Sequence, residues 1–436
     1  MQPKALPGFR DFYPAELALR AHIFRAWRTV ATRYGFEEYD GPPLEPLELY
    51  TAKSGEEIVG QLYSFTDKGG REVALRPEMT PTLARMVAAR ANGLRKPIRW
   101  YSIPQLFRYE RQQRGRLREH FQLNCDLIGE PGPLGDAEII ALAIDVLRAF
   151  GLGPEDVRLR ISDRRLLTAV LRGLDLDERQ SAVVYQVLDK LARVPREVSV
   201  ARLGEAGISE ATVARLLALT EARDWAELRD RGRGLGGALE AGEPLTRTVA
   251  ALDAMGLGGF LDLDLTIVRG LAYYTGTVFE LFDAKGELRA ICGGGRYDTL
   301  LQALGGVDLP ALGFGMGDVV LGELLRERGL MPGEAASIDV FLAGITPDDL
   351  AHVLALAHDV REAGLRAEYA LSAQAVGKQL KLADARGARV AVVIGPDDRA
   401  RGEVMVKDLS GKVQASVARD QAVRRVAELV GTQPSP

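Results

Sequence analysis

The chain has 436 residues, more than one compact core usually contains, so two or three domains are expected. Hydrophobic residues make up 47% and charged residues 27%, which is typical of a soluble globular protein. The net charge of −4 excludes a strongly basic protein, so contacts with nucleic acid would depend on local patches. We identify neither a signal peptide nor a membrane span, and we expect a cytoplasmic protein without a membrane partner.

The cysteines and histidines give no sign of a metal site. Cys125 and Cys292 lie in apolar or glycine-rich runs without the spacing of metal ligands, and two cysteines are too few for a disulfide scaffold. The four histidines are scattered along the chain. We therefore expect no metal to be held by a motif of protein side chains.

The N-terminal third of the chain reads as a mixture of helices and strands. Apolar residues at helical spacing predict a helix over 15–34, and a short extended run over 36–46 follows it. Two strands are predicted around a turn at 68–70, and a helix over 81–92. Two further extended segments, 97–110 and 119–129, precede an amphipathic helix over 136–152.

Residues 106–122, where these two extended segments are joined, hold five arginines, at positions 108, 111, 114, 116 and 118. A run of charge is usually a solvated loop. Here, however, the flanking segments are strand-like, so Arg108 would lie at the start of a hairpin loop on rigid backbone. A guanidinium held there could bind a phosphate or carboxylate through two hydrogen bonds, whereas the outer arginines could follow an RNA backbone. Residue types alone leave both interpretations open.

Residues 165–250 are rich in Leu, Ala, Arg and Glu and predict a helical insertion. Strand-like segments return over 261–283, 290–297 and 310–317. A helix over 318–329 comes next, with Asp318 as its expected N-cap. After a linker at 331–337, strands and helices alternate from residue 338 to the end, which predicts a small α/β domain with a mostly parallel sheet.

Three other motifs contain residues that suit a ligand, and each also has an ordinary structural explanation. Glu78 lies at a strand-to-helix junction, where it would favour the helix dipole or receive a substrate ammonium group. Tyr273 and Tyr274 would be aromatics of an ordinary strand or the lining of a pocket. The glycine-rich runs 292–298 and 313–318 allow close approach of backbone to a ligand, but they also serve tight packing, and neither is a Walker loop.

The order of the motifs resembles that of histidyl-tRNA synthetases, a family of class II aminoacyl-tRNA synthetases, nearly from end to end. The resemblance rests on "GFRDFYP", on "FRYERQQRGRLREHFQ" as class II motif 2, and on "VRGLAYYTGTVFE" and "GGGRYD" as the histidyl signatures. It implies a mixed α/β protein whose catalytic domain, 1–330, has an antiparallel sheet flanked by helices and carries the insertion at about 165–250. Residues 338–436 would form an anticodon-binding α/β domain.

The resemblance also implies a homodimer that uses ATP, with Mg²⁺, to convert L-histidine to histidyl-adenylate and to charge tRNA(His). Arg108 and Arg269 would be the catalytic residues, both at the α-phosphate. ATP would also contact Glu110 and Arg116. Histidine would contact Glu78, Thr80, Gln122, Asp126, Tyr273 and Tyr274. The acceptor end of the tRNA would contact Arg111, Gln113 and Arg118.

Two positions depart from the family pattern. Val320 stands where class II motif 3 normally supplies an arginine for the ATP γ-phosphate, and Ala272 replaces an aspartate of the histidyl signature. Both departures resemble those of plant organellar enzymes of the family. Arg326 and Arg328 lie more than a turn further along the same helix and are not equivalents. We expect Arg116, Arg296 or Mg²⁺ to help hold ATP instead.

Two other functions remain to be weighed. One is a synthetase-like paralogue that regulates histidine biosynthesis, but such a paralogue lacks the C-terminal domain and need not keep the arginine-rich loop. The other is a module that senses histidine or uncharged tRNA. A sensor has no need of Arg108 and Arg269, because it stabilises no transition state.

Overall fold

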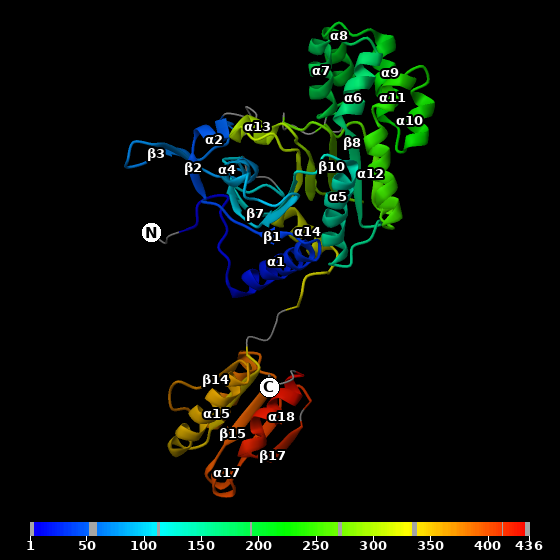
Figure 1. Cartoon of the computed structure of the whole chain (residues 1–436). Coiled ribbons are helices and arrows are strands. Elements are labelled where there is room, and N and C mark those ends of the chain that lie inside the picture. Colours follow the sequence, from blue (N-terminus) through cyan, green and yellow to red (C-terminus); the bar gives the residue numbers. More distant parts are fainter. Residues whose placement is uncertain are drawn as a thin grey trace. The chain divides into compact units, whose positions relative to one another are not determined.

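The structure is a computed structural model that describes residues 4–51, 59–110, 114–191, 194–268, 273–333, 338–411 and 413–431. The chain divides into two compact units, Met1–Met331 and Pro332–Pro436. Figure 1 shows both units with their labelled elements, and each is described here by itself. Part of the predicted linker, residues 334–337, lies outside the described residues.

A large sheet forms the centre of the first unit, and its described part has nine strands in the order β1-β5-β7-β12-β11-β10-β8-β9, with β6 also paired to β7. Only the pairs β1–β5 and β8–β9 at its two edges are parallel among the described pairings. The predicted antiparallel catalytic sheet is therefore confirmed. The strands are β1 (Glu37–Glu38), β5 (Ile98–Ser102), β6 (Gln105–Phe107), β7 (Glu119–Ile128), β8 (Val157–Asp163), β9 (Leu261–Leu263), β10 (Thr277–Asp283), β11 (Cys292–Arg296) and β12 (Ala311–Gly317).

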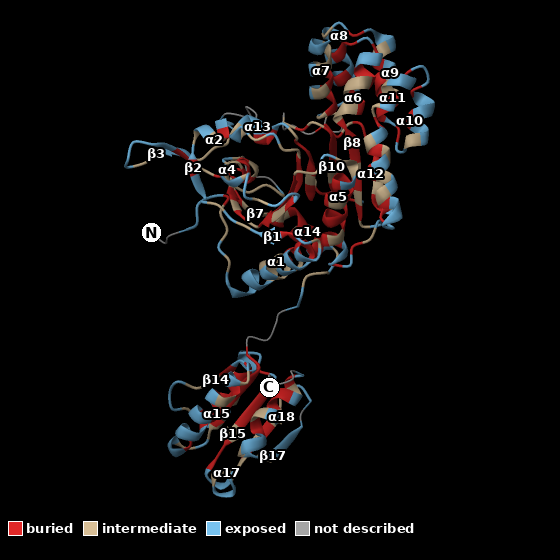
Figure 2. Ribbon diagram, in the orientation of Figure 1, coloured by how far each residue is buried: buried red, intermediate tan, exposed pale blue. Residues whose placement is uncertain are grey.

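Helix α5 (Pro133–Arg148) packs against this sheet and is itself covered by α1 (Pro14–Arg33) and α12 (Glu243–Ala254). Its residues from Ala137 to Leu147 are buried almost without interruption, as the red ribbon of Figure 2 shows. The prediction of an amphipathic helix was therefore wrong in this detail, because α5 has a neighbour on nearly every side.

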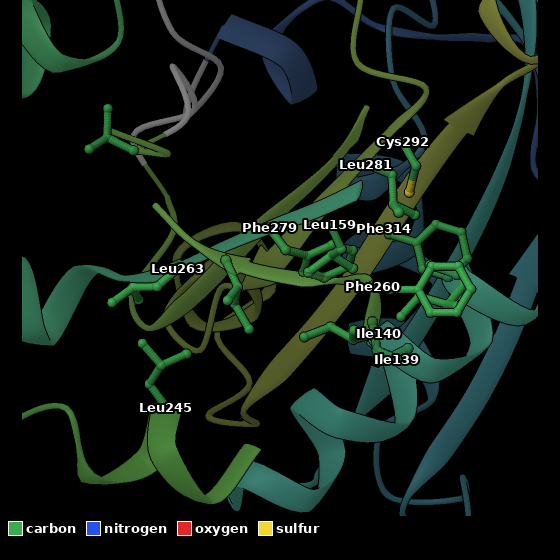
Figure 3. Close-up of a cluster of buried hydrophobic side chains, with 14 of the residues drawn as sticks. Ile139, Ile140, Leu159, Leu245, Phe260, Leu263, Phe279, Leu281, Cys292 and Phe314 are labelled. Atoms are coloured by element: carbon green, nitrogen blue, oxygen red, sulfur yellow. The ribbon is translucent and has the colours of Figure 1, made fainter. Parts of the chain in front are cut away.

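The main apolar core lies between α5 and the sheet (Figure 3). Strands β8 and β10 contribute Leu159, Phe279 and Leu281, and α5 contributes Ile139 and Ile140, all at most 1% exposed. Each such side chain stabilises the fold by about 1.5–3 kcal/mol on burial. This core supports one face of the sheet and leaves the other face available for polar side chains.

A smaller sheet, in the order β2-β4-β3, confirms the two strands predicted around the turn at 68–70, where Gly70 has a φ of +78°. Its strands are β2 (Leu44–Pro46), β3 (Ser64–Thr66) and β4 (Glu72–Leu75). The nearby helices are α2 (Glu48–Thr51), α4 (Thr80–Arg90) and α13 (Leu300–Gly305). The sequence did not predict α13, which packs on α4.

The insertion is helical, as predicted. Its helices are α6 (Arg164–Gly173), α7 (Glu178–Leu188), α8 (Arg196–Glu205), α9 (Glu210–Thr220), α10 (Trp225–Arg231), α11 (Gly236–Glu240) and α12, followed by the short η1 (Gly258–Phe260). Several begin with a side-chain cap: Asp163 accepts hydrogen bonds from the first turn of α6, and Asp224 does the same for α10. Because α12 packs along α5, the insertion is joined to the main core at its far end too.

The second unit is an α/β domain with the strand order β14-β13-β15-β16-β17. Only β13 with β14 and β13 with β15 are parallel, so the expected mostly parallel sheet was wrong for its second half. Strand β17 and helix α17 were not predicted. The elements are β13 (Val340–Gly344), β14 (Ala367–Tyr369), β15 (Val390–Ile394), β16 (Glu403–Asp408), β17 (Gln414–Ala418), η2 (Pro347–Asp349), α15 (Leu350–Glu362), α16 (Val376–Ala385), α17 (Pro396–Arg401), η3 (Arg419–Gln421) and α18 (Ala422–Val430).

None of the helices in the described part of the chain combines the length and the apolar character that crossing a membrane requires.

Candidate active site

Strand β7 places two of the predicted site residues on one face of the large sheet. Gln122 and Asp126 are four residues apart, and side chains alternate between the two faces of a strand, so both point to the same face. The neighbouring strand β12 pairs Gly313 with Asp126 and Gly317 with Gln122. The partner strand therefore brings no side chain of its own against either residue.

The glycines are needed because site residues lie where their Cβ atoms would be. A Cβ on Gly313 would stand 2.4 Å from Asp126 Oδ1, and one on Gly315 would stand 2.6 Å from the Gln122 side chain. On β11, a Cβ on Gly295 would stand 2.9 Å from Tyr274. The two glycine-rich motifs thus hollow the sheet under the polar residues, as close approach requires.

An acidic and aromatic cluster lies over this hollow. The Tyr273 hydroxyl donates to Glu78 Oε2 at 3.3 Å, and the Tyr297 hydroxyl donates to Asp126 Oδ1. The ring centroids of Tyr273 and Tyr274 are 5.1 Å apart, and those of Tyr273 and Tyr297 5.8 Å. Four predicted histidine-binding residues therefore meet in one cluster.

The remaining two predicted histidine contacts lie close by in the chain. Thr80 is the first residue of α4, two positions after Glu78. Gln122 shares the sheet face of Asp126 and also lines the larger cavity described below.

Burial dominates the electrostatics of this cluster. Asp126 is 4% exposed, and its desolvation raises the pKa of the carboxyl from 3.8 to about 7, although the hydrogen bond from Tyr297 acts in the opposite direction. Burial, and then the charge of Asp126, raise the pKa of the Tyr297 phenol well above its usual value. A cation that entered the cluster would favour the charged carboxylate.

The arginine-rich tract is a hairpin loop between β6 and β7, as predicted. Arg108 follows the last residue of β6, and its backbone N–H donates to the carbonyl of Arg118 at 3.0 Å. Its Nε donates to the Pro77 carbonyl at 2.9 Å. The outer end of the guanidinium is thereby held in one orientation, which is what a fixed phosphate ligand requires.

Arg108 lines a cavity of about 660 Å³, large enough for a nucleotide. The predicted ATP contacts Glu110 and Arg116 line it as well and form an ion pair at 2.9 Å. The charged residues of the lining are Arg108, Glu110, Arg116, Arg160, Glu280 and Arg289. His120 also lines the cavity, but its burial and the repulsion from Arg108 and Arg10 lower its pKa to about 3, so it is neutral at pH 7.

Of the predicted tRNA contacts and the second catalytic arginine, the structure describes only Arg118. Arg118 lies outside the cavity lining, with its guanidinium 4.2 Å from the ring centroid of Tyr109 and its Nε 3.4 Å from the Glu110 carbonyl. Arg111 and Gln113 lie outside the described residues. So do Arg269 and Ala272.

The expectation that Arg296 helps to hold ATP was wrong. Its side chain is 1% exposed and lies outside the cavity lining. Its Nη2 donates to Asp136 at 2.8 Å, and Nη1 donates to Asp298 and to the Glu130 carbonyl. Arg296 is thus a buried structural ion that joins β11 to the start of α5.

A brace at the back of the site was not predicted. Arg10 donates to Glu119 on β7 at 2.6 Å and to Asp318 at 2.9 Å. Asp318 also accepts from the backbone of Phe121, while Gly317 is the N-cap of α14 (Asp318–Glu327), so the predicted capping role of Asp318 was wrong. Arg10 and Tyr297 both lie in the quoted motifs, but nothing in the residue types revealed their partners.

Comparisons with known proteins agree with this architecture. A family model described as histidyl-tRNA synthetase matches residues 8–317, and one described as an anticodon binding domain matches residues 339–429. The chain belongs to the histidyl-tRNA synthetase family.

Two relatives and one solved structure illustrate the similarity. A histidine–tRNA ligase of Opitutus terrae is 48% identical over 433 residues, 98% of this chain and 99% of the relative. A chloroplastic/mitochondrial histidine–tRNA ligase of Arabidopsis thaliana is 39% identical over 94% of this chain and 84% of the relative. A crystal structure of histidyl-tRNA synthetase from Nostoc aligns with a TM-score of 0.85 at 26% identity, covering 98% of this chain and 99% of that one.

Proposed function

We propose that this protein is a histidine–tRNA ligase, an enzyme that activates L-histidine with ATP and transfers it to the 3′ end of tRNA(His). One observation carries the proposal above all: an acidic, tyrosine-lined cluster and an arginine-lined cavity share one face of the large sheet, with Gln122 and Asp126 on the same strand. An amino acid and a nucleotide need these two environments side by side.

In the first step the histidine carboxylate attacks the α-phosphorus of ATP, and pyrophosphate leaves. Arg108 holds a phosphoryl oxygen as negative charge shifts, a role that Arg269 shares in this proposal. Glu78, Thr80, Gln122 and Asp126 bind the ammonium group, and Tyr273 and Tyr274 line the imidazole pocket. Hydrogen bonds to both imidazole nitrogens would reject apolar side chains of similar shape.

Glu280 of β10 lines the cavity and would hold the Mg²⁺ that accompanies ATP, because Mg²⁺ prefers oxygen ligands. The ion would help to neutralise the charge of the phosphates. The second step needs tRNA(His), whose acceptor end would meet Arg111, Gln113 and Arg118. The unit from residue 332 would bind the anticodon. We further propose a cytoplasmic homodimer.

Two assays test the proposal in order. Purified protein should catalyse ATP–pyrophosphate exchange that depends on histidine, and should then charge tRNA(His). Exchange without charging would favour the regulatory or sensing alternative, and absence of exchange would refute the enzymatic function. Arg108→Ala should abolish exchange, whereas Arg114→Ala serves as the matched control, because Arg114 pairs with Glu323 at 3.4 Å on α14, outside the cavity lining.

A further inference from the structure

Among the residues that the structure describes, α14 brings no cation to the cavity that it borders. Val319 and Val320 line the cavity there, and Val320 is 8% exposed. Neither side chain can donate a hydrogen bond or carry charge. ATP brings a triphosphate whose far end bears most of its negative charge, so another group must meet that end.

The arginines further along α14 do not reach the cavity. Arg328 is bound on another side of the unit, with Nη2 2.6 Å from Asp283 and Nε 3.2 Å from Asp156. Arg326 lies near Gly322, beside which stands Ile23 of α1. Neither residue lines the cavity.

Arg289 does line it, as Val320 does. A Cβ built on Gly115 would lie 3.3 Å from Val320 Cγ2 and 3.7 Å from Arg289 Cδ, so both side chains lie next to Gly115. Arg289 therefore brings a cation to the part of the cavity that Val320 also lines.

The backbone that carries Arg289 is anchored on both sides. The N–H of Ile291, two residues later, donates to Leu281 at 2.7 Å, and the carbonyl of Ile291 accepts from Gly317 at 3.3 Å. The segment thus extends β11 between β10 and β12. Arg289 itself is an exposed residue.

We propose that Arg289 binds the β- and γ-phosphates of ATP, in place of the cation that Val320 does not supply. The inference rests on the proposed ligase function, since it takes ATP as the occupant of the cavity. A guanidinium suits the task, because its planar fork forms two hydrogen bonds to a phosphate and remains charged at every physiological pH. During activation it would also stabilise the pyrophosphate as it leaves.

Direct binding separates this role from general effects on activity. By calorimetry, Arg289→Ala should weaken the binding of ATP by about 10- to 100-fold, as expected for loss of a charge-assisted pair, and leave the binding of AMP unchanged. Arg326→Ala is the matched control and should bind both nucleotides as the unaltered protein does. Equal ATP affinity in Arg289→Ala and the control, or an equal loss for AMP, would overturn the inference.

A transplanted charge provides the second test. Val320→Arg in the Arg289→Ala background should restore most of the ATP affinity, because both positions line the cavity next to Gly115. Val320→Arg alone should not improve ATP binding, since it sets two guanidiniums side by side. No recovery in the double variant would contradict the inference. Because these tests measure binding, their outcome is distinct from a failure of the proposed reaction, which would appear as absent exchange in the unaltered protein.

Discussion

Among single residues, Asp126 has the environment most clearly set by its surroundings. It is enclosed by the sheet, by Gly313 and by the Tyr297 hydroxyl, and its pKa of about 7 follows from that burial. The native protein therefore holds a proton on Asp126 at pH values where the unfolded chain, with a pKa near 3.8, has released it. The contribution of Asp126 to the free energy of unfolding therefore falls as the pH rises from about 4 to about 7.

Asp126→Asn removes this titration, so the stability of the variant relative to the unaltered protein should increase between pH 4 and pH 7 and level off above pH 7. Urea denaturation at four pH values measures the difference. Asp308→Asn, a change at an exposed aspartate, should show no such trend. A constant difference across this range for Asp126→Asn would contradict the raised pKa.

Arg296 and Asp136 form a buried pair whose loss should affect stability rather than catalysis. Arg296→Met leaves the Asp136 carboxylate, 3% exposed, without its cation, which should lower the free energy of unfolding by about 3–5 kcal/mol. The Michaelis constant for ATP should stay within about twofold of its original value, as the pair lies outside the cavity lining.

The double variant Arg296→Met/Asp136→Leu should recover part of the lost stability, because no buried charge remains unpaired. If Arg296→Met instead raised the Michaelis constant for ATP without lowering stability, Arg296 would have to be assigned to ATP binding.

At this scale the sequence predicted which residues would lie together wherever they belonged to a motif of the family. Glu78, Asp126 and the tyrosines were named on that basis and meet in one cluster. The prediction for Arg296 was wrong because the sequence pattern of a glycine-rich motif is the same whether its arginine contacts a ligand or a buried aspartate. Only the packing of β11 against α5 distinguishes the two cases.

Among the elements, β12 matters because its glycines have no side chains. Its alternating glycines leave room for side chains of β7. The space for an added Cβ differs from one glycine to the next along the strand. Gly313→Ala should lower both stability and the affinity for histidine, because its Cβ would meet Asp126 Oδ1 at 2.4 Å and the Cys125 carbonyl at 2.6 Å. Thermal unfolding and isothermal histidine titration measure the two effects.

Gly317→Ala on the same strand is the control for stability, since no atom lies within 4 Å of its added Cβ. Its melting temperature should match that of the unaltered protein. Equal melting temperatures for both variants would show that the hollow is not required for folding.

Elements with a strong apolar period were predicted more reliably than those defined by their neighbours. The helix α1 and the hairpin of β6 and β7 follow from local pattern. The burial of α5 could not be predicted from its own sequence. It depends on packing against α12, which lies more than ninety residues later in the chain. Strand β17 is exposed along most of its length, and the alternation of Ala415 and Val417 with polar residues is too short to reveal it.

At the scale of the whole molecule, each of the two units has its own core. The second unit buries Val340, Leu342, Val392 and Val406 in a cluster of its own. We expect a fragment of residues 1–331 to fold and to keep histidine-dependent ATP–pyrophosphate exchange within about threefold. Its efficiency in charging tRNA(His) should fall by about 100-fold, because the tRNA would lose one of two linked binding sites.

Exchange and charging assays on the fragment and on the full chain measure these two activities. The control is the fragment supplemented in trans with the second unit, residues 332–436. Unchanged charging efficiency in the fragment would refute a tRNA-binding role for the second unit.

The hydrogen bonds from Arg10 to Glu119 and Asp318 have a consequence for how the arrangement of the candidate site could be lost. The guanidinium of Arg10 joins the strand that carries Gln122 and Asp126 to α14, which lines the cavity through Val319 and Val320. Proteolytic trimming of the first dozen residues would release both walls at once. Such a clipped protein would keep every side chain assigned here to a substrate and would still lose their alignment.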